Sequence, residues 1–227
     1  MRLKIMLLNE FRFLWKYGII ALYVVFTLIY LGLLAALPTS VREITAVLLV
    51  FTDPAAMGLF FMGAVVLLEK SQHVESSLSV SPIKIEEYII AKIIPMMIIA
   101  CLVALALCLY AHVNIILSLI GVAFSSVLFS LCGLSVGVNI KSLNSFMIAT
   151  VPFEIILCLP PLLYLFGLIQ SPLWLIHPGV SAIALISGQS QLGFPAILSI
   201  VFWIFPVFVY CKKAAAKSFI SLEGIKL

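Results

Sequence analysis

Long apolar runs dominate this chain of 227 residues. A helix that crosses the hydrocarbon core of a bilayer needs about 20 mostly apolar residues, because each residue advances the helix by about 1.5 Å. Candidate spans are residues 17–37, 44–68, 93–111, 115–138, 145–169 and 193–211. The pattern therefore predicts an all-α membrane protein with six transmembrane helices in a single transmembrane domain over residues 1–227.

Residues 1–16 show a two-sided pattern instead of a continuous apolar run. At helical spacing, one face carries the apolar residues Leu3, Leu7, Phe11, Leu14 and Trp15. The opposite face carries the polar residues Arg2, Asn9, Arg12 and Lys16. Lys4 and Glu10 fit this division less well. We predict an amphipathic helix lying in the inner membrane interface against anionic lipid, or alternatively a plain extension of the first span.

The longest polar interruption is residues 69–92, EKSQHVESSLSVSPIKIEEYIIAK, between the second and third spans. The chain has a mean hydropathy of +1.30 and only 10% charged residues, so a polar segment of this length stands out. It predicts a hairpin in water that meets a soluble partner, with a solvated loop of no consequence as the alternative.

A second unusual segment is residues 170–192, QSPLWLIHPGVSAIALISGQSQL, before the last span. It has no charged residue and two prolines, and its central apolar run is too short to cross a bilayer. Non-helical backbone at membrane depth is tolerated where protein buries it. We predict a short re-entrant or interfacial helix pair on the outer side.

The composition indicates that lipid surrounds the protein, and the positions of the charges indicate how it is oriented in the membrane. Apolar residues make up 64% of the chain, against about 45–50% in soluble domains, so lipid must cover the surface. If the N-terminus is cytoplasmic, every lysine and arginine except Arg42 lies inside. This bias predicts a multi-pass membrane protein with an even number of spans and both termini in the cytoplasm. The first apolar run is too long for a cleaved signal peptide.

Several kinds of chemistry find no support in the sequence. The five cysteines, Cys101, Cys108, Cys132, Cys158 and Cys211, lie in or beside spans without a CxxC pair and are predicted to be packing residues. His73, His112 and His177 do not share a metal-ligand spacing, so no metal site is predicted. GxxxxGK[ST] and HExxH do not occur, and GxSxG occurs once, as residues 133–137 within the apolar fourth span. No clustered nucleophile and base can be assembled, so the sequence predicts neither an ATPase nor a hydrolase. The sequence has no basic run interleaved with aromatic residues, so nucleic-acid binding is not predicted.

Two acids, Asp53 and Glu154, fall near the middle of predicted spans. An ionised acid at that depth costs several kcal/mol unless it is paired or takes up a proton. No lysine or arginine inside a span can pair with them, so we expect them to face the bundle interior or a wet cavity. They are either part of a translocation path or protonated structural acids, and the sequence leaves both interpretations open.

Small residues and prolines add two expectations about packing. Gly133 and Gly137 form a GxxxG motif in the fourth span, which predicts close packing against another helix without saying which one. Pro160 and Pro161 are expected to break or bend the fifth span, because proline removes a backbone donor.

The hairpin and the third span resemble the permease subunits of type-2 ABC exporters. The matching residues are Glu69, Lys70, Glu75, Leu78, Ser81, Pro82, Glu86 or Glu87, Tyr88 and Lys92. Two positions depart from the family pattern. The Gly-Thr of the family is replaced near His73 and Val74, and its second leucine is Ser79.

The resemblance implies a permease dimer, with a second copy or a paralogue, coupled to a cytoplasmic ABC ATPase dimer. That partner would bind ATP and magnesium, and this chain would hold no cofactor. Residues 69–92 would form the coupling hairpin through Glu69, Lys70, Glu75, Leu78, Ser81, Pro82 and Glu87. Residues 170–192 would form the outer gate with Trp174, His177 and Pro178. The expected cargo is hydrophobic or amphipathic, such as a drug, lipid or peptide.

Two other functions fit parts of the sequence. A proton- or ion-coupled carrier would use Asp53 and Glu154 and would need no ATPase. A membrane scaffold or immunity-type protein would transport nothing. A docking hairpin favours the exporter over the carrier.

Overall fold

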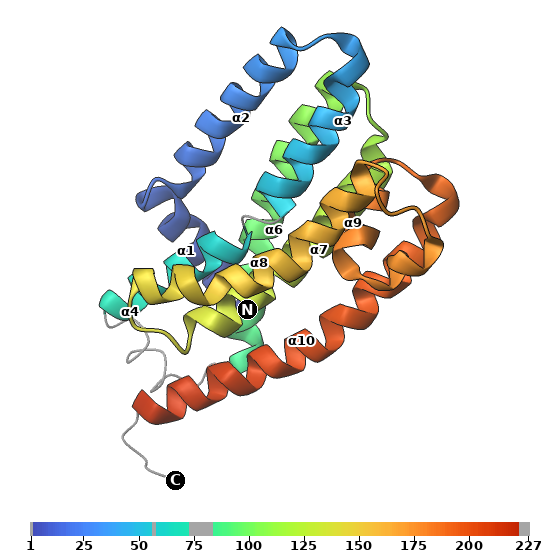
Figure 1. The fold of residues 1–227 in the computed structure, drawn as a ribbon. Helices are drawn as coiled ribbons and strands as arrows, with labels where there is room; N and C mark the ends of the chain where they lie inside the picture. The colour runs from blue at the N-terminus through green and yellow to red at the C-terminus, as the bar shows by residue number, and fades with distance from the viewer. Residues whose placement is uncertain (1, 56–57, 73–83, 223–227) are drawn as a thin grey trace.

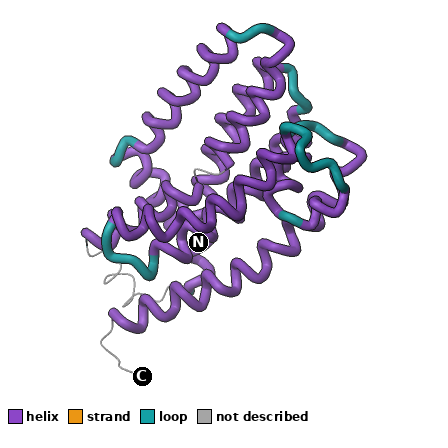
Figure 2. The backbone as a smooth tube through the Cα atoms, viewed as in Figure 1, coloured by secondary structure: helices purple, strands orange, loops and turns teal. Residues whose placement is uncertain are grey.

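The computed structural model describes residues 2–55, 58–72 and 84–222. These residues form helices and short connections, and none of them lies in a strand (Figures 1 and 2). In chain order the elements are α1 (Arg2–Lys16), α2 (Ile19–Ala36), α3 (Thr39–Val50), the π-helical segment η1 (Phe51–Ala55), α4 (Gly58–Ser71), α6 (Ile85–Ala111), α7 (Ile115–Gly137), α8 (Leu143–Leu165), the 3₁₀ helix η2 (Pro172–Ile176), α9 (Pro178–Ile186), the 3₁₀ helix η3 (Ser190–Leu192) and α10 (Gly193–Leu222).

Six stretches in the described part of the chain are long and apolar enough to cross a membrane, which confirms the predicted all-α membrane fold. They are Ile19–Ala36, Thr39–Ser71, Ile85–Ala111, Ile115–Gly137, Leu143–Leu165 and Ser190–Ser218. The second of them combines α3, η1 and α4. The third begins at Ile85 rather than at residue 93, because each charged residue there has a partner: Glu86 pairs with Lys212, Glu87 caps the helix, and Lys92 pairs with Glu10 and Glu69.

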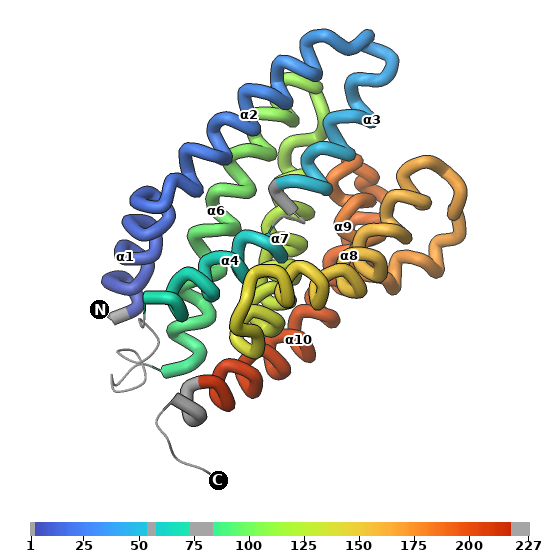
Figure 3. The backbone as a smooth tube through the Cα atoms, turned by 60° about the vertical axis from the view of Figure 1, so that its left-hand side comes forward, coloured from blue at the N-terminus to red at the C-terminus, as the bar shows by residue number. Residues whose placement is uncertain are grey.

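The bundle is organised around α7. This helix packs against α4, α6, α9 and α10, whereas α2, α8 and much of α10 lie at the periphery. Figure 3 shows α2 running beside α6 at one edge. The peripheral helices expose leucine, isoleucine and phenylalanine side chains that water would not tolerate in such numbers but lipid does. We call the end of the bundle where α4 ends and α6 begins the hairpin end.

The glycines of the GxxxG motif bring α7 against α4. A Cβ atom at Gly133 would overlap the backbone carbonyl of Leu59, and one at Gly137 would lie 3.2 Å from the Cα of Gly63. The predicted close packing is therefore confirmed, and its partner is a helix of the same chain. Because the backbones touch, neither glycine can carry a side chain without moving α4.

Residues 170–192 fold as short helical pieces that do not cross the bundle. All nine residues of α9 are buried, and the helix packs against α7, α8 and α10. This arrangement confirms the predicted re-entrant segment before the last span, since its backbone is covered by protein instead of lipid.

The prolines of α8 do not end the helix, which continues from Leu143 to Leu165. Of the two predicted outcomes, a break is therefore not found, and a bend stays a prediction. Pro161 has no N–H to offer the carbonyl of Leu157, one turn earlier. A Cβ atom at Gly179, near the start of α9, would overlap that carbonyl oxygen. The proline-freed carbonyl thus faces the tightly packed N-terminus of α9.

We predict that Gly133→Ala destabilises the full chain by about 1–3 kcal/mol, because the added methyl group meets backbone instead of a movable side chain. The matched control is Gly32→Ala on α2, where nothing lies within 4 Å of the added atom. The control should leave the unfolding temperature in mild detergent unchanged or slightly raised. Equal unfolding temperatures for the two variants would contradict this packing.

Candidate functional site

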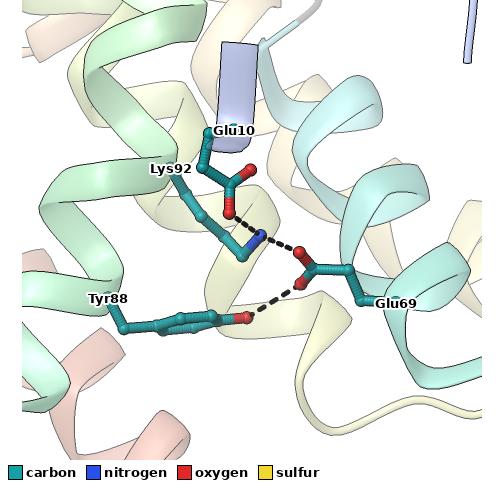
Figure 4. Close-up of polar contacts among 4 residues, drawn as sticks. All are labelled: Glu10, Glu69, Tyr88 and Lys92. Atoms are coloured by element: carbon teal, nitrogen blue, oxygen red, sulfur yellow. Dashed lines mark hydrogen bonds and ion pairs between the residues drawn. The ribbon is translucent and has the colours of Figure 1, made fainter. Parts of the chain in front are cut away.

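Charged side chains from three helices meet at the hairpin end (Figure 4). The ammonium of Lys92 on α6 lies 2.9 Å from Oε1 of Glu10 on α1 and 2.6 Å from Oε1 of Glu69 on α4. The hydroxyl of Tyr88, one turn before Lys92, donates a hydrogen bond to Oε2 of Glu69 over 3.4 Å. The Lys92 nitrogen also lies 5.0 Å from the centre of the Tyr88 ring, within range of a cation–π attraction. We call these four residues the Lys92 network.

Burial makes the Lys92 network energetically demanding. Lys92 is 2% exposed and Glu69 is 3% exposed. A buried charge that loses its partner costs several kcal/mol, so these groups hold one another in place. Two carboxylates share one ammonium, which leaves one excess negative charge if all three groups are ionised.

Within this network, the carboxyl of Glu10 has a shifted pKa. Burial raises the pKa of the Glu10 carboxyl above its ordinary value, and the neighbouring Lys92 opposes that rise. Because the folded-state pKa is raised, the contribution of Glu10 to stability is present at low pH. It is lost as the pH rises through the raised pKa.

The rotation of α1 explains why the sequence pattern of residues 1–16 was imperfect. Glu10 lies on the inner face of α1, beside the almost fully buried Leu14. Trp15, which the pattern placed on the same apolar face as Leu14, is 74% exposed, so the bundle covers Leu14 and leaves Trp15 uncovered. The helix is turned so that Glu10 reaches Lys92, which leaves Trp15 on the outside with Leu8 and Ile5. A tryptophan there suits a membrane interface.

Lys70, the residue after Glu69, ties α4 to the end of α7. Its ammonium donates to the carbonyl oxygens of Gly137, Val138 and Ile140 at 3.0, 2.6 and 3.1 Å. A cation is favoured at a helix C-terminus, where backbone carbonyls lack helical partners. The Ser218 hydroxyl of α10 donates to the same Val138 carbonyl over 3.2 Å. The hairpin end of α7 is therefore held from two sides.

The start of α6 is fixed in two further ways. The backbone N–H of Lys84 donates to Oε2 of Glu87 over 3.2 Å, so Glu87 caps the helix. Glu86 forms an ion pair with Lys212 of α10 at 2.5 Å, with both side chains about half exposed. Together with the Lys92 network, these contacts connect α1, α4, α6, α7 and α10 around the two ends of the hairpin.

The structure accounts for only some of the predicted coupling residues. Glu69, Lys70 and Glu87 make the intramolecular contacts just described and lie at the roots of the hairpin. Glu75, Leu78, Ser81 and Pro82 lie outside the described residues, so their role in docking stays a prediction. Glu10 was missing from the predicted site, and its misfit on the helix was the signal available. Tyr88 and Lys92 were among the residues that resemble the family, but they were given no role in coupling.

Asp53 lies in η1, where the second span departs from α-helical geometry. It is 3% exposed and so faces the interior, as expected for an acid at this depth. The Tyr30 hydroxyl of α2 interacts with its carboxyl without reaching full hydrogen-bond geometry. Neither carboxyl oxygen has another hydrogen-bond partner in the part of the chain described.

Glu154 is placed differently. It lies on the side of α8 that carries the buried Phe146 and Thr150, one turn beyond Thr150, and is partly exposed. Glu154 interacts electrostatically with Cys158, one turn further along α8, whereas Asp53 interacts with a tyrosine of α2, Tyr30. The two acids therefore do not form one cluster, and their part in a translocation path stays a prediction.

The predicted outer-gate residues lie together at the end of the bundle opposite the hairpin. Nδ1 of His177 accepts the backbone N–H of Val180 over 3.4 Å, which caps α9, and Pro178 opens that helix. Burial lowers the pKa of His177, so the imidazole is held in the neutral form that this cap needs. Trp174 is partly exposed on η2.

This segment is also held by α10. The Ile176 carbonyl accepts hydrogen bonds from Trp203 Nε1 at 2.8 Å and from the Ser199 hydroxyl at 3.1 Å. These contacts fix the segment to the last span, and whether it gates transport stays a prediction.

The sequence model of the fluoroquinolones export permease protein family matches residues 1–219, nearly the whole chain. The chain belongs to this family. Two similar proteins, from strains CDC 1551 and H37Rv of Mycobacterium tuberculosis, are named fluoroquinolones export permease proteins. Each is 27% identical to this chain over 155 residues. The match covers 66% of this chain and 65% of the length of each relative.

Membership of the fluoroquinolones export permease protein family confirms the resemblance to ABC-2-type permeases. The matched residues include the whole Lys92 network and the roots of the hairpin. This multi-pass membrane protein therefore belongs to a permease family, and within the described residues its most tightly connected charged groups lie beside the hairpin.

We predict that Lys92→Met destabilises the protein by about 3–5 kcal/mol, because Glu10 and Glu69 then lose their shared counter-charge. The triple variant Lys92→Met, Glu10→Leu, Glu69→Leu should recover most of that loss, since no unpaired charge is left. Thermal unfolding of the full chain in mild detergent measures both.

The control for this series is Lys212→Met, which breaks the half-exposed pair with Glu86. It should change the unfolding temperature little, because water solvates both groups when they separate. An unchanged unfolding temperature for Lys92→Met, or a triple variant no better than the single one, would contradict the analysis of the Lys92 network.

Proposed function

We propose that this chain is the membrane-spanning permease subunit of an ATP-driven ABC exporter, moved by a separate ATPase that binds the hairpin between α4 and α6. The observation that carries the proposal is the Lys92 network. It joins both roots of the hairpin to one another and to α1, so a partner that shifts the hairpin shifts three helices together.

A force from a partner reaches the bundle only through rigid contacts. The Lys92 network joins α1, α4 and α6 over bonds of 2.6–3.4 Å. Lys70 extends the connection to α7, the helix against which most of the others pack. The hairpin is thus connected to α7 at the centre of the bundle as well as to helices at its edge.

The distribution of charge supports a cytoplasmic hairpin. Lys70, Lys84 and Lys92 lie at the hairpin end, and Lys212 on α10 joins them through Glu86. Arg42 lies near the start of α3, at the opposite end of the bundle. Since lysine and arginine are retained in the cytoplasm, we place the hairpin and both termini inside a prokaryotic plasma membrane.

The proposed division of labour leaves nucleotide chemistry to the partner. The sequence has no GxxxxGK[ST] loop, so we assign ATP and magnesium to a dimeric cytoplasmic ATPase. The proposed cargo is a hydrophobic or amphipathic molecule of drug-like size, and the names of the relatives make fluoroquinolones the first compounds to test. Asp53 and Glu154 would lie on its path, and Trp174, His177 and Pro178 at its outer gate. A second permease copy or a paralogue would complete the path.

One observation favours a second candidate function. Asp53 is a buried acid that pairs with no cation among residues 2–55, 58–72 and 84–222, as a proton- or ion-coupled carrier would require. Such a carrier would work without an ATPase, which separates the two functions experimentally.

We predict that Glu75→Ala with Leu78→Ala lowers recovery of the ATPase at least tenfold when the tagged full chain is purified in mild detergent from its host. The double variant removes one charge and one apolar side chain from the hairpin, which should weaken docking without disturbing the spans. Membrane insertion and the unfolding temperature should therefore stay unchanged.

The matched control is Glu43→Ala with Ile44→Ala, an exposed acid and aliphatic pair on α3 at the other end of the bundle. It should recover the ATPase as the unaltered chain does. If the hairpin variant also recovers the ATPase normally and still exports its cargo, the hairpin is not the docking site.

A further inference from the structure

An apolar groove of about 260 Å³ runs between α2 and α6, in the half of the bundle nearer the hairpin end. Its walls include Ile20, Val24 and Leu28 of α2 and Ile99 and Leu102 of α6. Val24, Leu28 and Leu102 are each more than half exposed, so the groove is open along its rim. The rise from Ile20 to Leu28 spans about 12 Å, which is close to the thickness of about 15 Å that one leaflet adds to the hydrocarbon core.

The groove ends at α1. On α6, Lys92 and Ile99 are seven residues apart, so they lie on one face of the helix two turns from one another. The first of them binds Glu10 of α1, and the second lines the groove. Helix α1 packs against both α6 and α2, and Figure 3 shows it at the foot of these two helices. It therefore lies across the hairpin end of the groove.

The chain passes from α1 into the groove wall within a few residues. The backbone N–H of Gly18 donates to the carbonyl oxygen of Trp15 over 3.1 Å, which makes a tight turn between α1 and α2. Lys16 precedes this turn, and Ile20, the residue at the end of the groove, follows it. The Lys16 ammonium lies 5.6 Å from the centre of the Tyr17 ring, which keeps it beside the turn. A cation is thus held next to the opening of an apolar groove.

Arg12, one turn before Lys16, adds a second cation on the same exposed side of α1. The acids that form ion pairs within the described residues are Glu10, Glu69 and Glu86, and none of them pairs with Arg12 or Lys16. Two cations without a protein counter-charge at the membrane interface attract an anion from the membrane surface.

We propose that the groove, Arg12 and Lys16 form a binding site for an anionic phospholipid. One acyl chain lies between α2 and α6, and the lipid phosphate accepts hydrogen bonds from Arg12 and Lys16. Charge complementarity selects this occupant. A neutral lipid would fill the groove and leave both cations unpaired, whereas a soluble phosphate would meet the cations and leave the groove empty. With the orientation proposed above, the lipid comes from the inner leaflet.

Such a lipid would hold α2 to the rest of the bundle. Helix α2 lies at the periphery, and its contacts are with α1, α3 and α6. The phosphate would contact α1, which Glu10 ties to Lys92, while the acyl chain would contact α2 and α6 together. The lipid would therefore connect the most exposed span to the helices that carry the hairpin.

The test compares three probes: dioleoyl phosphatidic acid, dioleoylglycerol and glycerol 3-phosphate. The second has the same acyl chains without the phosphate, and the third has the phosphate without the chains. Binding to the full chain in mild detergent is measured by native mass spectrometry. The unaltered chain should bind phosphatidic acid roughly tenfold or more tightly than either of the other two, because charge-assisted hydrogen bonds and chain burial then act together. This comparison needs no variant.

Two variants locate the site, each with a matched control. Arg12→Gln with Lys16→Gln should weaken phosphatidic acid roughly tenfold and leave dioleoylglycerol unchanged. Its control, Lys213→Gln with Lys217→Gln, removes two exposed cations at the same spacing on α10 and should have little effect.

Leu102→Trp, which fills the groove from its rim, should weaken both lipids. Its control is Ile148→Trp, at a 75% exposed position on α8, which should weaken neither.

Four results would overturn the proposal. They are equal binding of phosphatidic acid and dioleoylglycerol, glycerol 3-phosphate bound as tightly as the lipid, an equal loss in the α1 and α10 double variants, and unchanged lipid binding in Leu102→Trp. The third result would mean diffuse attraction to the basic end of the bundle instead of a site. These measurements use the permease alone, so their outcome does not depend on whether an ATPase binds the hairpin.

Discussion

The ammonium of Lys92 is the charge on which the hairpin end depends. It is almost fully buried, and it touches one carboxylate from α1 and another from α4. Removing such an ion from water costs several kcal/mol, which only close partners offset. The three helices must therefore keep a fixed arrangement, because any separation leaves a charge unpaired in a dry place. The rotation of α1, the exposure of Trp15 and the early start of α6 all follow from this requirement.

The same constraint gives the permease a mechanical character. Apolar contacts in lipid let helices slide, since leucine meets lipid about as favourably as it meets protein. Charged contacts at the hairpin end do not slide, because a small displacement breaks bonds of 2.6–3.0 Å. Movement would therefore be rigid near the hairpin and compliant elsewhere. The π-helical segment that contains Asp53 and the peripheral helices α2 and α8, which pack less against the other helices, are the places where the bundle can yield.

The sequence predicted most of the architecture because lipid imposes simple lengths on it. Apolar runs of about 20 residues located the six spans, and an uncharged, proline-containing run located α9. The contacts between side chains could be predicted less well from the sequence. The contact between Lys92 and Glu10 joins residues 82 positions apart, and helical spacing alone does not fix how α1 is turned. The GxxxG motif predicted close packing but could not name α4. The start of the third span was predicted eight residues too far along the chain, at residue 93 instead of Ile85. Charged residues argue against a membrane span when their ion-pair partners are unknown.

The most direct test of the central claim, that the permease is moved by a partner, is transport by the purified chain alone. The chain is reconstituted into liposomes, a proton gradient is imposed, and uptake of the fluoroquinolone norfloxacin is followed by fluorescence. Our account predicts no accumulation above that of empty liposomes, and accumulation once the co-purified ATPase and ATP are added. Gradient-driven accumulation by the chain alone would contradict the account and make the protein a carrier that uses its buried acids.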